Sequence, residues 1–186
     1  MKKLVPLIAI FALAACGQMG NKNSTPAESA PAYTVPTDWQ TFTHDNFTIH
    51  FPTTWKVNQN QTGPVFFIYA PVDYDYQYFV QNINLVTESI KGRGIDLDKY
   101  SESSAKLLKS YLSNLSTVNS KKMKDANGEY QQVVYSGDKD TFHLIFEQQY
   151  RIVNDEAYVL TYMSLKQQWQ KDHQTGENIM STFSVK

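Results

Sequence analysis

The stretch Glu156-Ala157-Tyr158-Val159-Leu160-Thr161-Tyr162-Met163-Ser164-Leu165 decides the fold, because it is apolar on both sides when it is extended. Side chains alternate along a strand, so Val159, Met163 and Leu165 lie on one face and Tyr158, Leu160 and Tyr162 on the other. A strand with two apolar faces has to be covered from both sides. Helices are the available covers, so the stretch predicts a sheet with helices packed on it.

Strand patterns lie on both sides of this stretch. Phe47, Ile49 and Phe51 alternate with polar residues until Pro52, and residues 65–70 form a short apolar run. Residues 83–87 alternate again, and residues 141–153 precede the two-faced stretch across Asn154-Asp155. Asn127-Gly128 is a strong hairpin signal between residues 117–123 and 129–136, and residues 137–140 predict a further turn.

Two amphipathic helices are expected. Residues 97–115 place Leu and Tyr at three- and four-residue steps, with Asp96 as N-cap. Residues 167–182 form the second helix, with Gly176 as a weak point. The predicted fold class is therefore α/β (α+β), a mostly antiparallel sheet flanked by helices in an α/β/α sandwich.

The first residues have the pattern of a lipoprotein export signal. Met1-Lys2-Lys3 is followed by an apolar run from Leu4, and the chain's single cysteine, Cys16, follows Leu13-Ala14-Ala15. We expect residues 1–15 to be removed and Cys16 to be lipidated. A plain secretory cleavage after Ala14 stays open. The apolar run is about 18 Å long as a helix, too short for about 30 Å of hydrocarbon.

The segment after Cys16 predicts a tether. Residues 17–37 are rich in Pro, Ser, Ala and Asn and carry few large apolar side chains, so they cannot order themselves by burial. The predicted organisation is a signal peptide at 1–15, a lipidated cysteine with a flexible tether at 16–37, and one folded domain at 38–186. Gly17 in place of aspartate favours the outer over the inner membrane, by analogy with enterobacterial lipoproteins, with the domain facing the periplasm.

Composition excludes several classes of partner. The formal net charge is −1, which leaves no basic surplus for nucleic acid. A single cysteine provides no disulfide framework, so stability has to come from packing, to which 12 Tyr, 10 Phe and 3 Trp contribute. No cofactor is expected.

Four sets of residues carry a resemblance to a known family. They are Phe47-Thr48-Ile49-His50-Phe51-Pro52-Thr53-Thr54-Trp55, Asn82-Ile83-Asn84-Leu85-Val86, Leu97-Asp98-Lys99-Tyr100 and Ala157-Tyr158-Val159-Leu160-Thr161-Tyr162, followed by Ile179 and Ser181-Thr182-Phe183. In order and spacing they resemble the PsbP-like superfamily, which includes DcrB-type bacterial lipoproteins. The resemblance covers nearly all of residues 39–186 and implies a three-layer domain used mainly as a binding or assembly module. None of the superfamily's metal ligands or docking residues is matched to a position here.

Residues that carry catalysis or bind metals form no recognised motif. There is no Gly-x-Ser-x-Gly elbow, P-loop or His-Glu-x-x-His. His44 and His50 are expected on one strand face, about 20 Å apart, too far for one metal. His143 is expected mid-strand and partly covered, and His173 has no partner at metal-ligand spacing. The pairs Asp96/Asp98 and Asp138/Asp140 fit a helix start and a turn. We therefore expect no metal site and no catalytic residue.

The segment Asp73-Tyr74-Asp75-Tyr76-Gln77-Tyr78 departs from plain folding patterns. If it is extended, its three tyrosines share one face, and tyrosine suits recognition surfaces. Packing of these rings against the sheet edge is the alternative. Tyr74, Asp75, Tyr76 and Tyr78 are the candidate partner-binding residues.

The sequence thus favours a non-enzymatic envelope lipoprotein, held to the membrane through Cys16, whose PsbP-like domain binds or stabilises another envelope component, expected to be a protein. Two alternatives stay open. A periplasmic carrier of a small apolar ligand or lipid would show an apolar pocket between sheet and helix. An enzyme would show a cleft in which His143 reaches a carboxylate.

Overall fold

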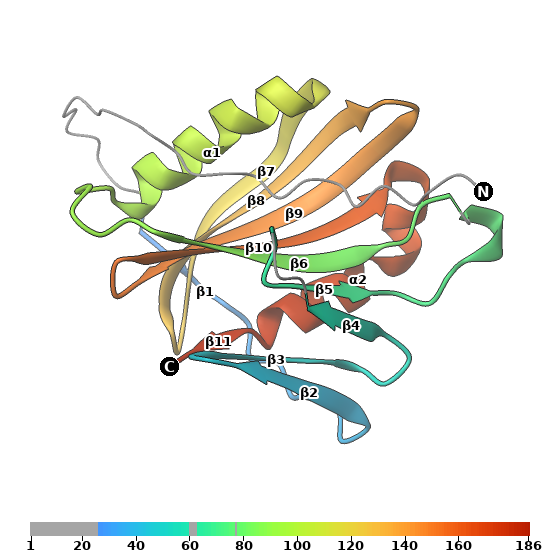
Figure 1. The fold of residues 1–186 in the computed structure, drawn as a ribbon, viewed down its shortest axis with the longest axis horizontal. Coiled ribbons are helices and arrows are strands. Elements are labelled where there is room, and N and C mark those ends of the chain that lie inside the picture. The colour runs from blue at the N-terminus through green and yellow to red at the C-terminus, as the bar shows by residue number, and fades with distance from the viewer. Residues whose placement is uncertain (1–25, 60–62, 77) are drawn as a thin grey trace.

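The computed structural model describes residues 26–59, 63–76 and 78–186, which form two sheets and two long helices (Figure 1). The large sheet has the strand order β1-β7-β8-β9-β10-β6-β5-β4, and the small sheet has the order β11-β3-β2. The first half of the chain contains β1 (Glu28–Ser29), β2 (Trp39–His44), β3 (Phe47–Pro52), β4 (Lys56–Gln59), β5 (Phe66–Tyr69), the 3-10 turn η1 (Tyr74–Tyr76) and β6 (Asn82–Ser89). The second half contains α1 (Leu97–Tyr111), β7 (Ser113–Asp125), β8 (Gly128–Lys139), β9 (Phe142–Val153), β10 (Glu156–Leu165), α2 (Lys166–Ser181) and β11 (Ser184–Val185).

The two-faced stretch forms β10, which is antiparallel to both of its neighbours, β9 and β6. On one face, Met163 and Leu165 belong to a core that includes Tyr100 and Leu108 of α1. On the other face, Tyr158, Leu160 and Tyr162 pack in a second core with residues of α2 and of the small sheet. The predicted mostly antiparallel sheet with helices on its two faces is confirmed.

The second face has a cover that the sequence pattern did not predict. β2 and β3 form a hairpin that pairs with β11 and lies with α2 below the large sheet in Figure 1. The alternating residues Phe47, Ile49 and Phe51 are buried, as expected, but in the small sheet. His44 belongs to β2 rather than to the strand of His50, because the chain turns at Asp45, whose φ is 47°.

The turn between β8 and β9 lies later in the chain than the sequence predicts. The expected turn at residues 137–140 is wrong: β8 continues to Lys139, and the chain turns after it at Asp140, whose φ is 54°. Gly137 has a packing role instead. A Cβ there would lie 3.3 Å from Leu115 Cδ1 and 3.5 Å from Leu112 Cβ, so glycine lets β8 approach the chain that leaves α1.

Other local predictions have clear outcomes. Asp96 caps α1 by accepting a hydrogen bond of 2.8 Å from the Lys99 amide, as expected. α1 ends at Tyr111 rather than at residue 115, because Leu112 is already extended and leads into β7. Asn154 and Asp155, which join the two predicted strand stretches, have φ of 52° and 61°, the values of a tight hairpin turn between β9 and β10.

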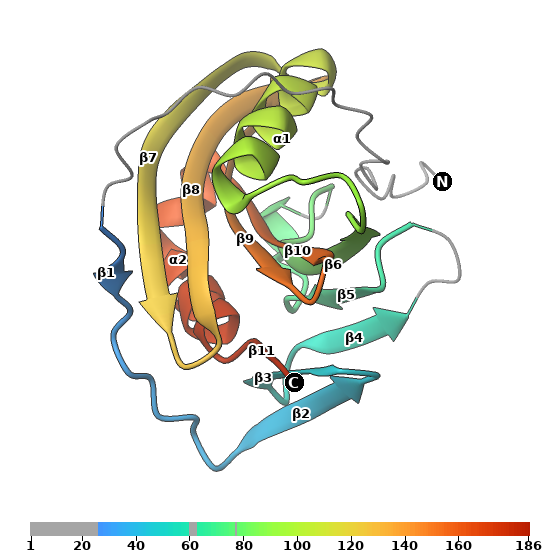
Figure 2. The ribbon, with the colours of Figure 1, turned by 90° about the vertical axis from the view of Figure 1, so that its left-hand side faces the viewer.

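Part of the predicted tether lies against the body. Glu28 and Ser29 form β1, a short parallel partner of Met123 and Lys124 in β7, and the Ala30 amide donates to Lys124 O at 2.8 Å. Figure 2 shows the chain continuing along the edge of β7 to β2. Cys16 and the predicted signal segment lie outside the described residues. No helix of the described part of the chain is long and apolar enough to cross a membrane.

Candidate functional site

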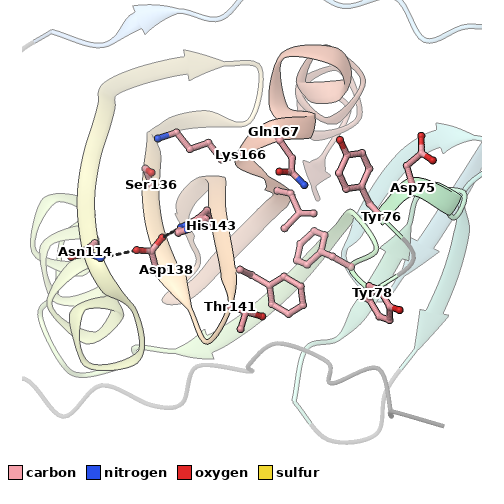
Figure 3. A pocket seen from close by; sticks show the side chains of 13 residues that line it. Asp75, Tyr76, Tyr78, Asn114, Ser136, Asp138, Thr141, His143, Lys166 and Gln167 are labelled. Atoms are coloured by element: carbon pink, nitrogen blue, oxygen red, sulfur yellow. Dashed lines mark hydrogen bonds and ion pairs between the residues drawn. The ribbon is translucent and has the colours of Figure 1, made fainter.

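An open pocket of about 790 Å³ lies at one end of the large sheet (Figure 3). Four segments meet there: η1 with its link to β6, the start of β7, the β8–β9 hairpin near its turn, and the junction of β10 with α2. The pocket has two walls of different chemistry, one aromatic and one polar.

The aromatic wall comes from the η1–β6 link and from the start of β9. Tyr76, Tyr78 and Phe79 line the pocket beside Phe142. The rings of Phe79 and Phe142 are in contact, with centroids 5.7 Å apart. Leu165, at the end of β10, adds an aliphatic contact. This wall offers ring faces and edges to an apolar part of a ligand.

The polar wall is centred on Asp138 of β8. Its Oδ1 lies 2.7 Å from His143 Nδ1, and its Oδ2 accepts a hydrogen bond of 2.7 Å from Asn114 Nδ2. These hydrogen bonds from Asn114 and His143 lower the pKa of Asp138. Ser136 and Lys166 lie on the same side of the pocket (Figure 3).

Backbone register explains how these polar residues meet. Asp138 and His143 are directly opposite each other in the β8–β9 ladder, in the last pair but one before the turn. Asn114 reaches them from the start of β7, where its φ of 52° and a register shift between Ser113 and Ser116 interrupt regular pairing with β8. The site therefore depends on the shifted turn at Asp140 as much as on the residue types.

The tyrosine segment is not an extended strand. Residues Tyr74–Tyr76 form a 3-10 turn, so the extended conformation in which the three tyrosines would share one face is not the one adopted. Asp73 fixes the turn, since its Oδ1 accepts a hydrogen bond of 3.1 Å from the Asp75 amide. Asp75, Tyr76 and Tyr78 line the pocket, whereas Tyr74 lies outside its lining.

Exposure separates the three rings. Tyr74 is 86% exposed and Tyr78 is 75% exposed, so neither packs against the sheet edge. Tyr76 is half-buried against the core on the α1 side. Of the three tyrosine rings, Tyr76 is therefore the one that packs against the body of the protein.

The described histidines do not form a cluster. His143 was expected to be partly covered, but its side chain is 76% exposed at the pocket. His50 Nδ1 pairs with Thr41 Oγ1 at 2.9 Å, and His173 Nδ1 with Trp169 O at 2.8 Å. Among the described residues, no group of three or more His, Cys, Asp and Glu side chains is arranged to hold a metal ion.

The His143–Asp138 pair is the arrangement that would favour an enzyme, but its surroundings do not complete a catalytic group. A serine nucleophile needs a hydrogen bond to its base, and within the described part of the chain no hydrogen bond joins Ser136 to His143. The imidazole also faces solvent, where electrostatic stabilisation is weak. The geometry named above for an enzyme, a cleft in which His143 reaches a carboxylate, is therefore present, without a serine nucleophile bonded to the imidazole among the described residues.

Comparison with known proteins gives structural matches only. No family model matches the sequence, and no curated relative matches it. CyanoP, the cyanobacterial PsbP of Synechocystis, superposes with a TM-score of 0.61 at 10% identity and covers 84% of this chain and 98% of its own.

Two further solved structures superpose over most of the chain. PA94 of Pseudomonas aeruginosa, a protein of unknown function, gives a TM-score of 0.58 at 9% identity over 80% of this chain and 97% of its own. LpqN of Mycobacterium tuberculosis, which is involved in cell envelope biogenesis, gives 0.54 at 13% identity over 83% and 82%. At these identities the likeness establishes the fold alone. The chain thus has the PsbP-like fold that its sequence resembles.

Proposed function

We propose that this protein is a non-enzymatic envelope lipoprotein, anchored through a lipidated Cys16, whose PsbP-like domain binds or stabilises another envelope component. The pocket end of the large sheet is the proposed contact surface. The observation that carries this proposal is the exposure of Tyr74 and Tyr78 beside a pocket that already has an oriented polar wall.

Exposed tyrosines at a pocket have no role in holding this fold together. Tyr74 makes no ring contact with the core, although a tyrosine ring gains free energy when it is buried. Tyr74 on the 3-10 turn and Tyr78 just after it present a large ring surface with polar tips, which is the composition of protein recognition sites. A partner surface that covers these rings would remove them from water.

The polar wall supports the same proposal. Hydrogen bonds from Asn114 and His143 hold the Asp138 carboxylate in one orientation before any ligand arrives. A preorganised carboxylate loses less freedom on binding than a mobile one. Lys166 and Asp75, at the rim of the same pocket, supply both signs of charge for selectivity.

The envelope assignment rests on the first residues of the chain. The positive start, the short apolar run and the Leu13-Ala14-Ala15-Cys16 pattern support export and acylation. The fold is also used by an envelope biogenesis protein, LpqN. Placement in the outer membrane, with the domain facing the periplasm, follows from Gly17 by analogy.

Affinity capture from cells tests the contact surface. The full-length protein should retain at least one envelope protein that the double variant Tyr74→Ala, Tyr78→Ala loses, whereas Val118→Ala, an exposed apolar change on β7, should retain it. Equal thermal unfolding of all three proteins shows that the loss is local. Retention of the same partners by the double variant overturns the proposal.

A carrier of a small apolar ligand or lipid is the second candidate. Phe79, Phe142 and Leu165 give the pocket an apolar wall that suits an acyl or aromatic group. A carrier should leave cells with a bound molecule, which native mass spectrometry detects as an added mass. Loss of that mass in Phe142→Ala would favour a carrier over protein docking.

A further inference from the structure

A second cavity of about 330 Å³ lies on the other side of Phe79 and has its own polar lining. It is enclosed by residues 70–73 after β5, residues 79–81 before β6 and the first turns of α2. Phe79 is the one residue that lines both this cavity and the larger pocket. The cavity is therefore distinct from the pocket of the proposed function, and its ligand is inferred from its own lining.

Gln168 of α2 gives the first indication of a ligand. Its side chain lines the cavity and is only 3% exposed, yet no described residue forms a hydrogen bond with its Oε1. Buried polar atoms are almost always paired, and an unpaired acceptor costs free energy. An acceptor kept without a partner in the wall of a cavity is explained by a ligand that donates a hydrogen bond to it.

Carboxylates surround the same space. Gln168, Lys171, Asp172 and Thr175 follow one another at helical spacing, so they share the face of α2 that lines the cavity. Asp172 Oδ2 accepts a hydrogen bond of 2.8 Å from Gln81 Nε2, which fixes the carboxylate. Asp73 lies across the cavity. Among the described residues of the lining, Lys171 is the one cation. Its Nζ lies 3.6 Å from Asp73 Oδ2, and its side chain is mostly exposed.

The lining is therefore complementary to a cation that carries several hydrogen-bond donors. It contains one more carboxylate than ammonium group, and its unpaired buried group is an acceptor. A primary ammonium has three donors and no acceptor, which matches Gln168 Oε1 with the two carboxylates. Trp55 and Phe79 offer ring surface to the carbon chain that carries the ammonium.

We propose that this cavity binds a primary ammonium group, from a small free amine or from a lysine side chain of a peptide. Gln168, Asp172 and Asp73 receive its hydrogen bonds. The volume lies at the lower end of the range for small-molecule sites, which fits a short aliphatic amine.

The test is a titration of the full-length protein in neutral detergent with three four-carbon probes. Putrescine carries ammonium groups, 1,4-butanediol carries hydroxyls and succinate carries carboxylates. Nuclear magnetic resonance of ¹⁵N-labelled glutamine side chains reports on Gln168 and Gln81. We expect saturable shifts with putrescine, at least tenfold weaker binding of the diol, and none with succinate. Equal responses to all three probes, or none to putrescine, overturn the proposal.

Variants and a peptide complete the design. Asp172→Asn and Gln168→Leu should each weaken putrescine binding at least tenfold, whereas Glu102→Gln on the outer face of α1 should leave it unchanged. If Gln168→Leu does not fold, Asp172→Asn at the partly exposed carboxylate decides alone. Binding of an acetylated Ala-Lys-Ala amide identifies a lysine side chain as an acceptable source, and its exclusion leaves the free amine. The variant Tyr74→Ala, Tyr78→Ala should bind putrescine normally, so failure here is distinct from failure of the proposed function.

Discussion

Two pairs of a carboxylate with a basic side chain lie at opposite ends of β9. Asp125–Arg151 lies beside the turn from β7 to β8, and we call this the closed end because its basic side chain is buried. Asp138–His143 lies at the pocket, beside the turn from β8 to β9, and we call this the open end because its basic side chain is exposed. At the closed end, Asp125 binds Arg151 through two hydrogen bonds, of 3.0 and 2.5 Å. The Arg151 side chain is 3% exposed, and its guanidinium lies 4.3 Å from the centroid of the Tyr130 ring. At the open end, Asp138 meets His143 in the wall of the pocket, where the imidazole faces solvent.

This difference separates structural from functional polar groups. A buried, doubly bonded guanidinium that is also stacked on an aromatic ring has little to offer a ligand, and its removal leaves a buried charge. An oriented carboxylate beside exposed rings contributes little to stability and is free to be covered. We therefore expect mutations at the closed end to change stability and mutations at the open end to change binding.

Loss of the closed pair should have the largest effect on stability. Arg151→Met leaves Asp125 without its partner and should lower the free energy of unfolding by about 3–5 kcal/mol. Urea unfolding measures this change. The double variant Arg151→Met, Asp125→Leu should recover much of the loss, because it removes the stranded charge as well. A cost below about 1 kcal/mol for Arg151→Met would contradict the structural role of this pair.

A buried carboxylate in the middle of the hairpin predicts a dependence on pH. Glu147 is fully buried on the face of β9 toward α2, and burial raises its pKa to about 7, with a further rise from Glu177 against hydrogen bonds from Gln132 and Gln149. The unfolded chain loses this proton near pH 4.5, whereas the folded chain keeps it to about pH 7. Stability should therefore fall as pH rises between these values, by up to about 3 kcal/mol.

The variant Glu147→Gln isolates this contribution. It mimics the protonated acid, so its unfolding free energy should be flat over the window in which the wild type declines, and at pH 8 it should be the more stable protein. Glu129→Gln, an exposed change on β8, is the matched control and should keep the wild-type slope. Urea unfolding at pH 5 and pH 8 provides the comparison. An equal pH dependence for the wild type and Glu147→Gln between pH 5 and pH 8 would show that Glu147 is already ionised in the folded protein.

Gly176 of α2 gives a test whose sign is informative. Helix propensity alone predicts that Gly176→Ala stabilises by about 1 kcal/mol. A Cβ at this position would lie 2.6 Å from atoms of the Tyr162 ring, however. This ring projects from β10 and is buried under α2. We expect a loss of about 1–3 kcal/mol from overpacking. A higher melting temperature for the variant would mean that α2 packs less closely on the sheet.

The open end should show the smallest change in stability. Tyr74→Ala and Tyr78→Ala should each alter the free energy of unfolding by less than about 0.5 kcal/mol, because both rings are exposed. Thermal unfolding checks this expectation. A larger loss at either position would indicate that the ring is packed, and the contrast between the two ends would then fail.

The sequence predicted the layers of the fold more completely than its site. The two apolar faces of β10 and the Asp96 cap are local patterns with local causes, and each is confirmed. The small sheet was missed because β11 has only two residues and pairs with β3 from the far end of the chain. No periodicity reports such a pairing.

The polar wall could not be predicted for a related reason. The expected turn at residues 137–140 would have placed Asp138 in a loop, away from His143. Gly137 favours a turn in the sequence, whereas in the structure it lies within β8, close to Leu112 and Leu115. Asn114 joins Asp138 from a position 24 residues earlier in the chain. The residue types of the segment predicted Asp75 and Tyr78 as site residues. The difference in burial between Tyr76 and Tyr78 depends on contacts with residues distant in the sequence, which the segment alone does not indicate.

Site-specific photo-crosslinking in intact cells tests the central claim most directly. A photoreactive phenylalanine at position 78, on the rim of the pocket, should capture a defined envelope protein, and the same residue at position 118, on β7, should capture much less of it. Alanine at Tyr74 should reduce capture from position 78. Equal capture from both positions, or capture at 118 alone, would contradict the assignment of the open end of the sheet as the binding surface.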